Sequence, residues 1–401
     1  VKTGIRLSDM IKRPELDYEK LAPVDHNRPT LPDAVCEQVE IKLKYDGYIK
    51  RQIAQVEQFK KMVDVFMANG FNYFDTAHIY HDGESEKAIR KAVSSRYPRE
   101  SFILTDKLTT NCFNKQEDIR PLFKQQLKDS GVDYFDFYLM HSQDAAIYEK
   151  FRRCNAYETA LEMQKEGKFR HFGISFHDKA EVLEQILKDY PQIEAVQIQF
   201  NYLDYGDPAV DSKRVYEVCE KYGKAVIVME PVKGGNLVNL PEKAQGILDS
   251  LNSGMSNASY AIRFAASFPN MFMVLSGMSD LAQINDNMSY MKDFKPLDEK
   301  EMQAVNDVRK AFSEINLIPC TACHYCTSGC PMNISIPELF SCYNHKVNFH
   351  DWNQDYYYAQ ITRDGGKPSE CIECGQCEGI CPQHLEIIRL LKDVSGEFEK
   401  K

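Results

Sequence analysis

The chain has 401 residues, of which 43% are hydrophobic and 27% are charged, and its formal net charge is −10. This balance is ordinary for a globular protein and argues against a surface devoted mainly to nucleic acid. The sequence has no run of about 18 apolar residues, so we expect no membrane span. Its first nine residues lack the basic-then-apolar layout of a signal peptide, so we expect a cytoplasmic protein.

The N-terminal segment, residues 1–62, is polar and punctuated by prolines before its pattern becomes helical. Several phrases in it resemble, in order, the helical C-terminal tail of the MnmG (GidA) family of tRNA-modifying flavoenzymes. These phrases are Arg13–Tyr18, Glu37–Ile41, Lys44–Arg51 and Gln55–Lys61. The resemblance implies a helical segment and, where the tail is functional, a tRNA or GTPase partner. An ordinary basic amphipathic helix is the alternative interpretation.

The middle of the chain, residues 63–294, alternates short apolar runs with amphipathic helical patterns. Buried-type strands joined by helices predict a parallel sheet, either open or closed into a barrel. We expect seven strands, at Asn72–Asp75, Phe102–Lys107, Phe135–Met140, His171–Ser175, Ala195–Gln199, Ala225–Glu230 and Met273–Ser276.

Polar residues gather at the ends of these strands, namely Asp75, Lys107, His141 and Ser175. In a (β/α)8 barrel this end carries the active site. An open doubly wound sheet is the competing interpretation, and it is weakened because no Gly-x-Gly-x-x-Gly follows the first strand.

The run Phe74-Asp-Thr-Ala-His-Ile-Tyr80 resembles the signature of the aldo-keto reductase family. Three further pieces follow in the family's order: Ile103–Lys107, Asp133–His141 and Gly173–Ser175. The resemblance implies a (β/α)8 TIM barrel and four catalytic roles. Tyr80 is the acid, Lys107 tunes it, Asp75 holds the lysine, and His141 orients the carbonyl.

These residue types suit the reduction of a carbonyl group. The reaction needs an acid for the forming alkoxide, and a nearby Lys⁺ favours ionisation of a tyrosine whose ordinary pKa is about 10. Taken singly, Tyr80 would be a surface tyrosine, Lys107 a solvated lysine, His141 a core histidine and Asp75 a helix cap.

The same resemblance implies a nicotinamide cofactor, NAD or NADP. In the family, the carboxamide of the nicotinamide is held at positions that correspond to Ser175 and Gln197. The positions around the adenosine end of the cofactor correspond to Gly277, Gln283 and Asn287. The stretch Ser276–Asn287 contains no Lys or Arg, which leaves the choice between NAD and NADP open.

The family's first barrel strand and its Gly-rich turn have no counterpart in the sequence. We therefore expect a barrel whose first strand is missing or replaced, with two exposed sheet edges. A linker over residues 295–318 follows, with a helix at Asp298–Phe312.

The C-terminal part contains two runs of the form C-x₂-C-x₂-C-x₃-C-P and resembles bacterial-type dicluster ferredoxins. The fourth Cys of such a run ligates the other cluster. We therefore expect two [4Fe–4S] clusters in an α+β ferredoxin-like domain over residues 319–392, followed by a tail at 393–401. One cluster takes Cys320, Cys323, Cys326 and Cys381, and the other takes Cys371, Cys374, Cys377 and Cys330.

Structural zinc is the alternative for these cysteines. Zinc takes four ligands, usually as two CxxC pairs, and does not explain two runs of four that each end in proline. Cys342 lies outside both runs and is interpreted as a small buried residue.

Together these features predict an iron–sulfur oxidoreductase acting on a small carbonyl or alcohol substrate, with the clusters serving as a relay to a redox partner protein or as structure. An electron-transfer protein with the barrel as scaffold is one alternative. A tRNA-modification module fused to a reductase fragment is another.

Overall fold

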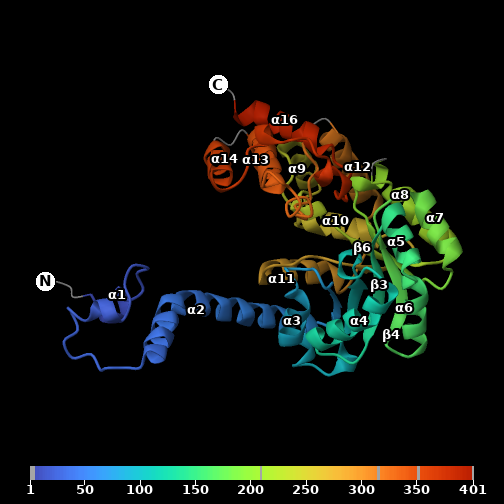
Figure 1. Ribbon diagram of the computed structural model, residues 1–401. Coiled ribbons are helices and arrows are strands. Elements are labelled where there is room, and N and C mark those ends of the chain that lie inside the picture. The colour runs from blue at the N-terminus through green and yellow to red at the C-terminus, as the bar shows by residue number, and fades with distance from the viewer. Residues whose placement is uncertain (1–4, 208–209, 314–316, 350–352, 400–401) are drawn as a thin grey trace. The chain divides into compact units, whose positions relative to one another are not determined.

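The computed structural model describes residues 5–207, 210–313, 317–349 and 353–399 (Figure 1). The chain divides into two compact units, residues 1–68 and 69–401.

The N-terminal unit is helical, as the sequence predicts. It contains α1 (Leu7–Met10), a 3₁₀ turn at Glu19–Leu21 and the long helix α2 (Asp33–Ala68). The backbone N–H of Tyr18 donates to Glu40 Oε1 at 2.7 Å, which ties the loop to α2. The predicted boundary after residue 62 falls inside α2, which runs unbroken to Ala68.

The second unit is built on a sheet of seven parallel strands, in the order in which they occur in the chain. The predicted seven strands are confirmed, and among the described residues β1 and β7 each pair on one side only. The strands are β1 (Tyr73–Asp75), β2 (Ile103–Leu108), β3 (Phe135–Gln143), β4 (Phe169–Phe176), β5 (Ala195–Gln199), β6 (Ala225–Met229) and β7 (Met271–Val274).

Two strands are longer than predicted: β4 runs from Phe169 to Phe176 rather than from His171 to Ser175, and β3 is extended past its apolar pattern. The predicted strand ends at Met140, but β3 continues to Gln143 across a register shift against β4. Ser142 has a positive φ of 55° at this irregularity. The polar residues after Met140 hide the extension, because a bulge breaks the alternation on which the prediction depends.

Helices separate the strands and cover the outside of the sheet, as a succession of β–α units requires. The apolar core at one end of the strands contains Leu139 and Ile227, both completely buried. The helices of this part are α3 (Ser85–Ile89), α4 (Gln116–Ser130), α5 (Ala145–Arg153), α6 (Ala156–Lys165), α7 (Ala180–Asp189), α8 (Ser212–Lys221), α9 (Glu242–Asp249), α10 (Asn257–Ala266), α11 (Leu281–Met291) and α12 (Glu299–Ser313).

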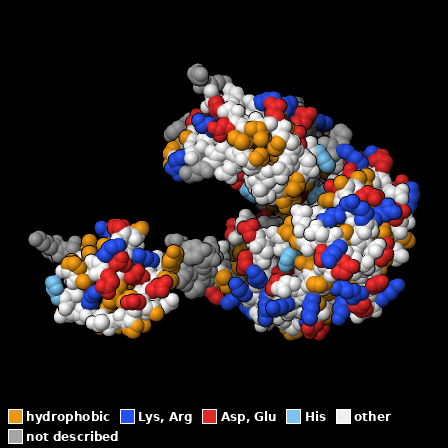
Figure 2. Space-filling model, in the orientation of Figure 1, with side chains coloured by type: hydrophobic (Ala, Val, Ile, Leu, Met, Phe, Trp, Pro, Cys, Tyr) orange, Lys and Arg blue, Asp and Glu red, His pale blue; other side chains and the backbone are white. Residues whose placement is uncertain are grey.

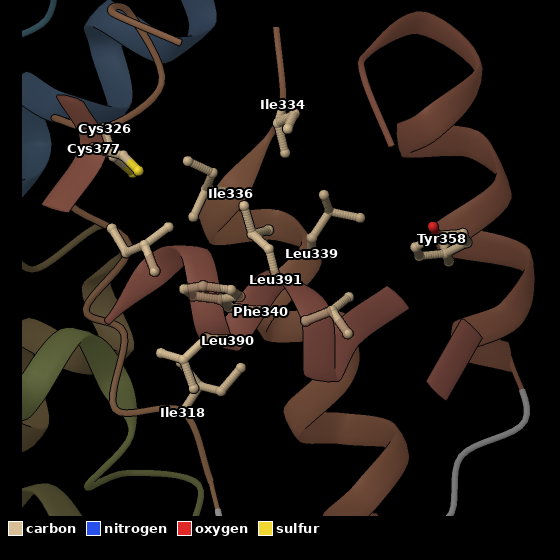
Figure 3. Packing of buried hydrophobic residues seen from close by; sticks show 12 residues of the cluster. Ile318, Cys326, Ile334, Ile336, Leu339, Phe340, Tyr358, Cys377, Leu390 and Leu391 are labelled. Carbon is tan, nitrogen blue, oxygen red and sulfur yellow. The ribbon is translucent and has the colours of Figure 1, made fainter. Parts of the chain in front are cut away.

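The last part of this unit, residues 317–399, is here called the cluster domain, and residues 69–313 are called the barrel. The helices of the cluster domain are α13 (Ile336–Phe349), α14 (Asn353–Asp364), α15 (Gln376–Gly379) and α16 (Ile387–Phe398). Leu339 and Phe340 of α13 pack with Leu390 and Leu391 of α16 in a core of its own (Figure 3).

The surface carries charges of both signs. Lys and Arg side chains alternate with Asp and Glu over the face seen in Figure 2. Among the described helices, none is long and apolar enough to span a bilayer.

Candidate functional site

The four predicted catalytic residues come from three adjacent strands and one loop. Asp75 ends β1, Lys107 lies near the end of β2, and His141 lies in β3. Tyr80 follows β1 in the next loop. Because β1, β2 and β3 are parallel neighbours, their carboxyl ends lie at the same edge of the sheet.

Lys107 and Asp75 form a buried ion pair. Lys107 is completely buried. Its Nζ donates to Asp75 Oδ1 at 2.5 Å and to the Thr76 carbonyl oxygen at 2.9 Å. Burial by itself would lower the pKa of Lys107, but the Asp75 carboxylate and the Tyr80 phenol outweigh it and raise the pKa. The lysine is therefore a permanent positive charge in the interior.

Tyr80 lies between this charge and a neutral histidine. Lys107 Nζ is 4.7 Å from the centroid of the Tyr80 ring, and the rings of Tyr80 and His141 are 5.7 Å apart, edge to face. Burial raises the pKa of Tyr80, and Lys107 opposes that rise only in part. Burial, followed by the charge of Lys107, lowers the pKa of His141 well below its usual value. His141 Nδ1 lies 2.7 Å from Thr109 Oγ1, which fixes the ring.

Gln197 and Ser175, predicted to hold the carboxamide of the nicotinamide, lie close to the four predicted catalytic residues. Gln197 Nε2 donates to Asp75 Oδ2 at 3.0 Å, so it braces the same carboxylate that holds Lys107. Ser175 Oγ accepts from the backbone N–H of Ser142 at 2.7 Å, beside the irregular end of β3. Both side chains are buried.

The residues predicted for the adenosine end lie around the start of α11, where they make hydrogen bonds to nearby residues. Gln283 Oε1 accepts from the backbone N–H of Ser279 at 2.7 Å, and Asn287 Nδ2 donates to Ser276 Oγ at 3.0 Å. Gly277 lies in the loop between β7 and α11, and a Cβ there would meet open space. Their cofactor roles stay predictions.

The structure brings the eight cluster cysteines together in two groups. Cys320, Cys323, Cys326 and Cys381 line one small cavity. Cys330, Cys371, Cys374 and Cys377 line a second small cavity. The fourth cysteine of each run thus lies with the first three of the other, which is the crossed arrangement expected from the spacing.

The donor set of each cavity fits a [4Fe–4S] cluster, because four thiols surround one space. Ile336 lines both cavities and lies between them. Burial raises the pKa of Cys320 to about 11 and that of Cys326 to about 12, so the free thiols are protonated at neutral pH. Cluster binding would therefore release protons. The ligand assignment itself stays a prediction.

Sequence reasoning missed several polar residues at the carboxyl end of the barrel. Thr109 orients His141, and Lys233 and Gln383 lie buried near the cluster cysteines. Lys233 and Thr109 belong to loops without a recognisable motif. Gln383 could have been found from the sequence. It is a polar residue directly after Cys381-Pro382, whereas the first run has the apolar Met332 after Cys330-Pro331.

The barrel carries a buried Lys–Asp pair beside a tyrosine at the carboxyl ends of its parallel strands. This arrangement is typical of an oxidoreductase site. The aldo/keto reductase family model matches residues 48–310, more than half of the chain, so the chain belongs to this family. A 4Fe-4S dicluster domain matches residues 319–386, and the MnmG/GidA C-terminal helical domain matches residues 1–53. All three resemblances are confirmed.

The solved structures that resemble this chain are similar in fold. An aldo-keto reductase from Klebsiella pneumoniae in complex with NADPH has a TM-score of 0.53 and 18% identity, covering 64% of this chain and 86% of the other. The holo form of an aldo-keto reductase from Bacillus halodurans has a TM-score of 0.51 and 24% identity, covering 62% and 86%.

The curated relatives match only a short part of the chain. The tRNA uridine 5-carboxymethylaminomethyl modification enzyme MnmG of Caldicellulosiruptor saccharolyticus is 56% identical over 62 residues, which cover 16% of this chain and 10% of the relative. MnmG of Lachnoclostridium phytofermentans is 53% identical over 75 residues, covering 19% and 12%. The chain thus spans about a tenth of these relatives.

The crossed grouping predicts which cysteine substitutions act on the same cluster. Cys381→Ser and Cys323→Ser should remove the same component of the EPR spectrum of the dithionite-reduced protein, and Cys330→Ser and Cys374→Ser should remove the other. Cys342→Ala, which changes a buried cysteine outside both cavities, should retain both components and the full iron content. Loss of one shared component in Cys381→Ser and Cys374→Ser would contradict the crossing.

Proposed function

We propose that this protein is an iron–sulfur oxidoreductase that transfers a hydride between a nicotinamide cofactor, NAD or NADP, and a carbonyl or alcohol substrate. The observation that carries the proposal is the buried Lys107–Asp75 pair beside Tyr80 at the carboxyl end of the sheet. An uncompensated lysine would not stay charged in this interior, so the pair serves to hold a positive charge at the phenol.

Each side chain has a defined part in this reaction. Tyr80 gives its phenolic proton to the substrate oxygen, and Lys107 stabilises the phenolate that remains. Asp75 and Gln197 hold the Lys107 side chain in place. Neutral His141, fixed by Thr109, orients the carbonyl group. The nicotinamide, when bound, supplies the hydride.

The clusters have two compatible roles in the proposal. Iron–sulfur clusters exchange single electrons, so they would relay electrons to a partner protein or hold the cluster domain in shape. An electron-transfer protein whose barrel is only a scaffold is the second candidate, supported by the eight cysteines around two cavities.

Replacing the proposed acid separates these two functions. Tyr80→Phe should lower the rate of NAD(P)H-dependent reduction of a test aldehyde by roughly 10²–10⁴-fold, because general-acid catalysis is lost. The exposed Tyr356→Phe is the matched control and should keep the activity of the unsubstituted protein. Equal turnover of both variants would remove Tyr80 from catalysis and favour the scaffold function.

The same site predicts a particular pH dependence. His141, whose pKa is lowered well below its usual value by burial, stays neutral at neutral pH, and Tyr80, whose pKa is raised by burial, stays protonated there. The kcat/KM for carbonyl reduction should therefore show no limb from either residue around neutral pH, where an ordinary histidine would titrate. A limb with a midpoint near pH 6.5 that disappears in His141→Gln would contradict the assignment of His141 as a neutral group.

A third candidate function belongs to the N-terminal unit, and the match of residues 1–53 to the MnmG/GidA tail supports it. On this proposal the unit binds tRNA through basic residues of α2. The double variant Lys42→Glu/Lys44→Glu in the full chain should bind tRNA about tenfold more weakly at modest salt, because phosphate contacts are electrostatic. Lys243→Glu in α9 makes the same kind of charge change outside this unit and serves as control. Absence of tRNA binding by the unsubstituted protein would contradict this proposal.

A further inference from the structure

His78 lies in the loop after β1, two residues before Tyr80, and faces a buried carboxylate. Its Nδ1 lies 3.1 Å from both carboxylate oxygens of Glu86, the second residue of α3. A second His–Glu pair of the barrel provides a comparison, because His171 Nδ1 lies 2.7 Å from one oxygen of Glu194. Charge-assisted hydrogen bonds are typically about 2.7–2.9 Å long. The His171 pair is therefore an ordinary hydrogen bond, whereas the His78 pair is longer and symmetric.

A third metal-ligating side chain lies beside this pair. The helix α3 packs against α4 (Figure 1). Asp129 belongs to the last turn of α4, and one nitrogen or oxygen atom from each of His78, Glu86 and Asp129 lies within 4.8 Å of the other two. Bonds of about 2.0–2.2 Å to an ion such as Zn²⁺ place its ligand atoms about 3–4 Å apart. The separation of His78 and Glu86 matches that geometry, and the half-exposed Asp129 needs a shift of about 1 Å or less to join them.

Asp106 of β2 gives an independent sign that positive charge is needed at this place. Its side chain is completely buried, and its Oδ2 has no hydrogen-bond partner among the described residues. The Asp106 carboxyl faces that of Glu86 within hydrogen-bond reach, and Gln126 of α4 donates to Asp106 Oδ1 at 3.1 Å. Two buried carboxyl groups thus lie together, and buried charges in proteins are paired or coordinate metals.

Neighbouring basic side chains do not balance these two carboxyl groups. Lys107 Nζ is already paired with Asp75, and Lys107 bonds to Asp106 through its backbone N–H. In the described part of the chain, His78 is the basic side chain that bonds to Glu86, and it is charged only when protonated. Burial raises the pKa of Glu86, and burial followed by the charge of Glu86 raises the pKa of Asp106. A divalent cation would supply the positive charge that both carboxylates require.

We propose that His78, Glu86 and Asp129 form a site for a divalent transition-metal ion of the Zn²⁺ class. An imidazole combined with carboxylates is a donor set that such ions bind. Asp106 lies next to Glu86 as an outer partner that orients this ligand. The bound ion joins the loop after β1 to α3 and α4, so it also fixes residues 76–84, the loop that presents Tyr80. The site takes no part in hydride transfer, and it goes beyond the proposed function.

Zinc binding by the cluster-loaded protein tests the site. After equilibrium dialysis against free Zn²⁺, we expect one zinc ion per chain, measured by mass spectrometry together with the iron content. His78→Ala and Glu86→Gln should lose this zinc. Asp129→Asn changes a half-exposed side chain and should weaken binding at least about tenfold, since loss of even an outer partner costs about 10–100-fold in affinity. His171→Ala breaks the other His–Glu pair and should keep the zinc.

Hydrogen exchange gives a second readout on the same proteins. At a free zinc concentration about ten times the dissociation constant, exchange in residues 76–84 should become about tenfold slower, because the ion stabilises the closed form that binds it. The same zinc concentration should have a much smaller effect in Asp129→Asn. Exchange in β5 and the iron content should be alike in all variants, which shows that they are folded and loaded.

Two results would overturn the site: no zinc in the unsubstituted protein, or equal zinc in it and in His78→Ala, Glu86→Gln and Asp129→Asn at equal iron content. Exchange in residues 76–84 that zinc does not alter would overturn the role of the ion in fixing the loop. Neither measurement uses turnover, so both results are independent of the proposed reductase function, which Tyr80→Phe tests.

Discussion

The buried side chain of Gln383 makes the central polar contacts between the cluster domain and the barrel. The Gln383 amide pairs with the amide of Gln199, and its oxygen accepts from Lys233. Both contacts break if the Gln383 side chain moves. A buried polar group that loses its partner costs free energy, and without Gln383 the Gln199 Oε1 would lose its partner while Lys233 would keep only Asp204. Because Gln383 lies two residues after Cys381, the same bonds that hold the domain also hold one corner of the cavity lined by Cys320, Cys323, Cys326 and Cys381.

The catalytic end of the barrel is assembled independently of the missing strand. Asp75, Lys107 and His141 belong to three consecutive strands, and the pairing of β1 with β2 and of β2 with β3 is complete without an eighth strand. The absence of a first barrel strand affects the two edge strands, β1 and β7, and the loop that would follow that strand. Asp75, Lys107 and His141 therefore lie together at the carboxyl ends of β1, β2 and β3, with Asp75 on the edge strand β1.

The sequence predicts most of this molecule because its signals are periodic or closely spaced. Seven apolar runs predict seven strands, and the cysteine spacing predicts two crossed groups, which the cavities of Cys326 and Cys377 match. The docking of the cluster domain could not be predicted, because Gln199, Lys233 and Gln383 are separated in sequence and meet only in the fold. The net direction of the Tyr80 pKa also required the structure, since burial outweighs the nearby Lys107. The extension of β3 to Gln143 was hidden by a bulge.

Hydrogen exchange of the cluster-loaded protein tests the central claim, that Gln383 fixes the cluster domain on the carboxyl end of the barrel. We predict slow exchange in the loop 230–237 of the unsubstituted protein and exchange at least about tenfold faster in Gln383→Leu, because opening becomes easier when the network is lost. Met332→Ala, at the equivalent position of the other run, should leave this loop protected. Equal exchange of the loop in the unsubstituted protein and in Gln383→Leu would contradict the account.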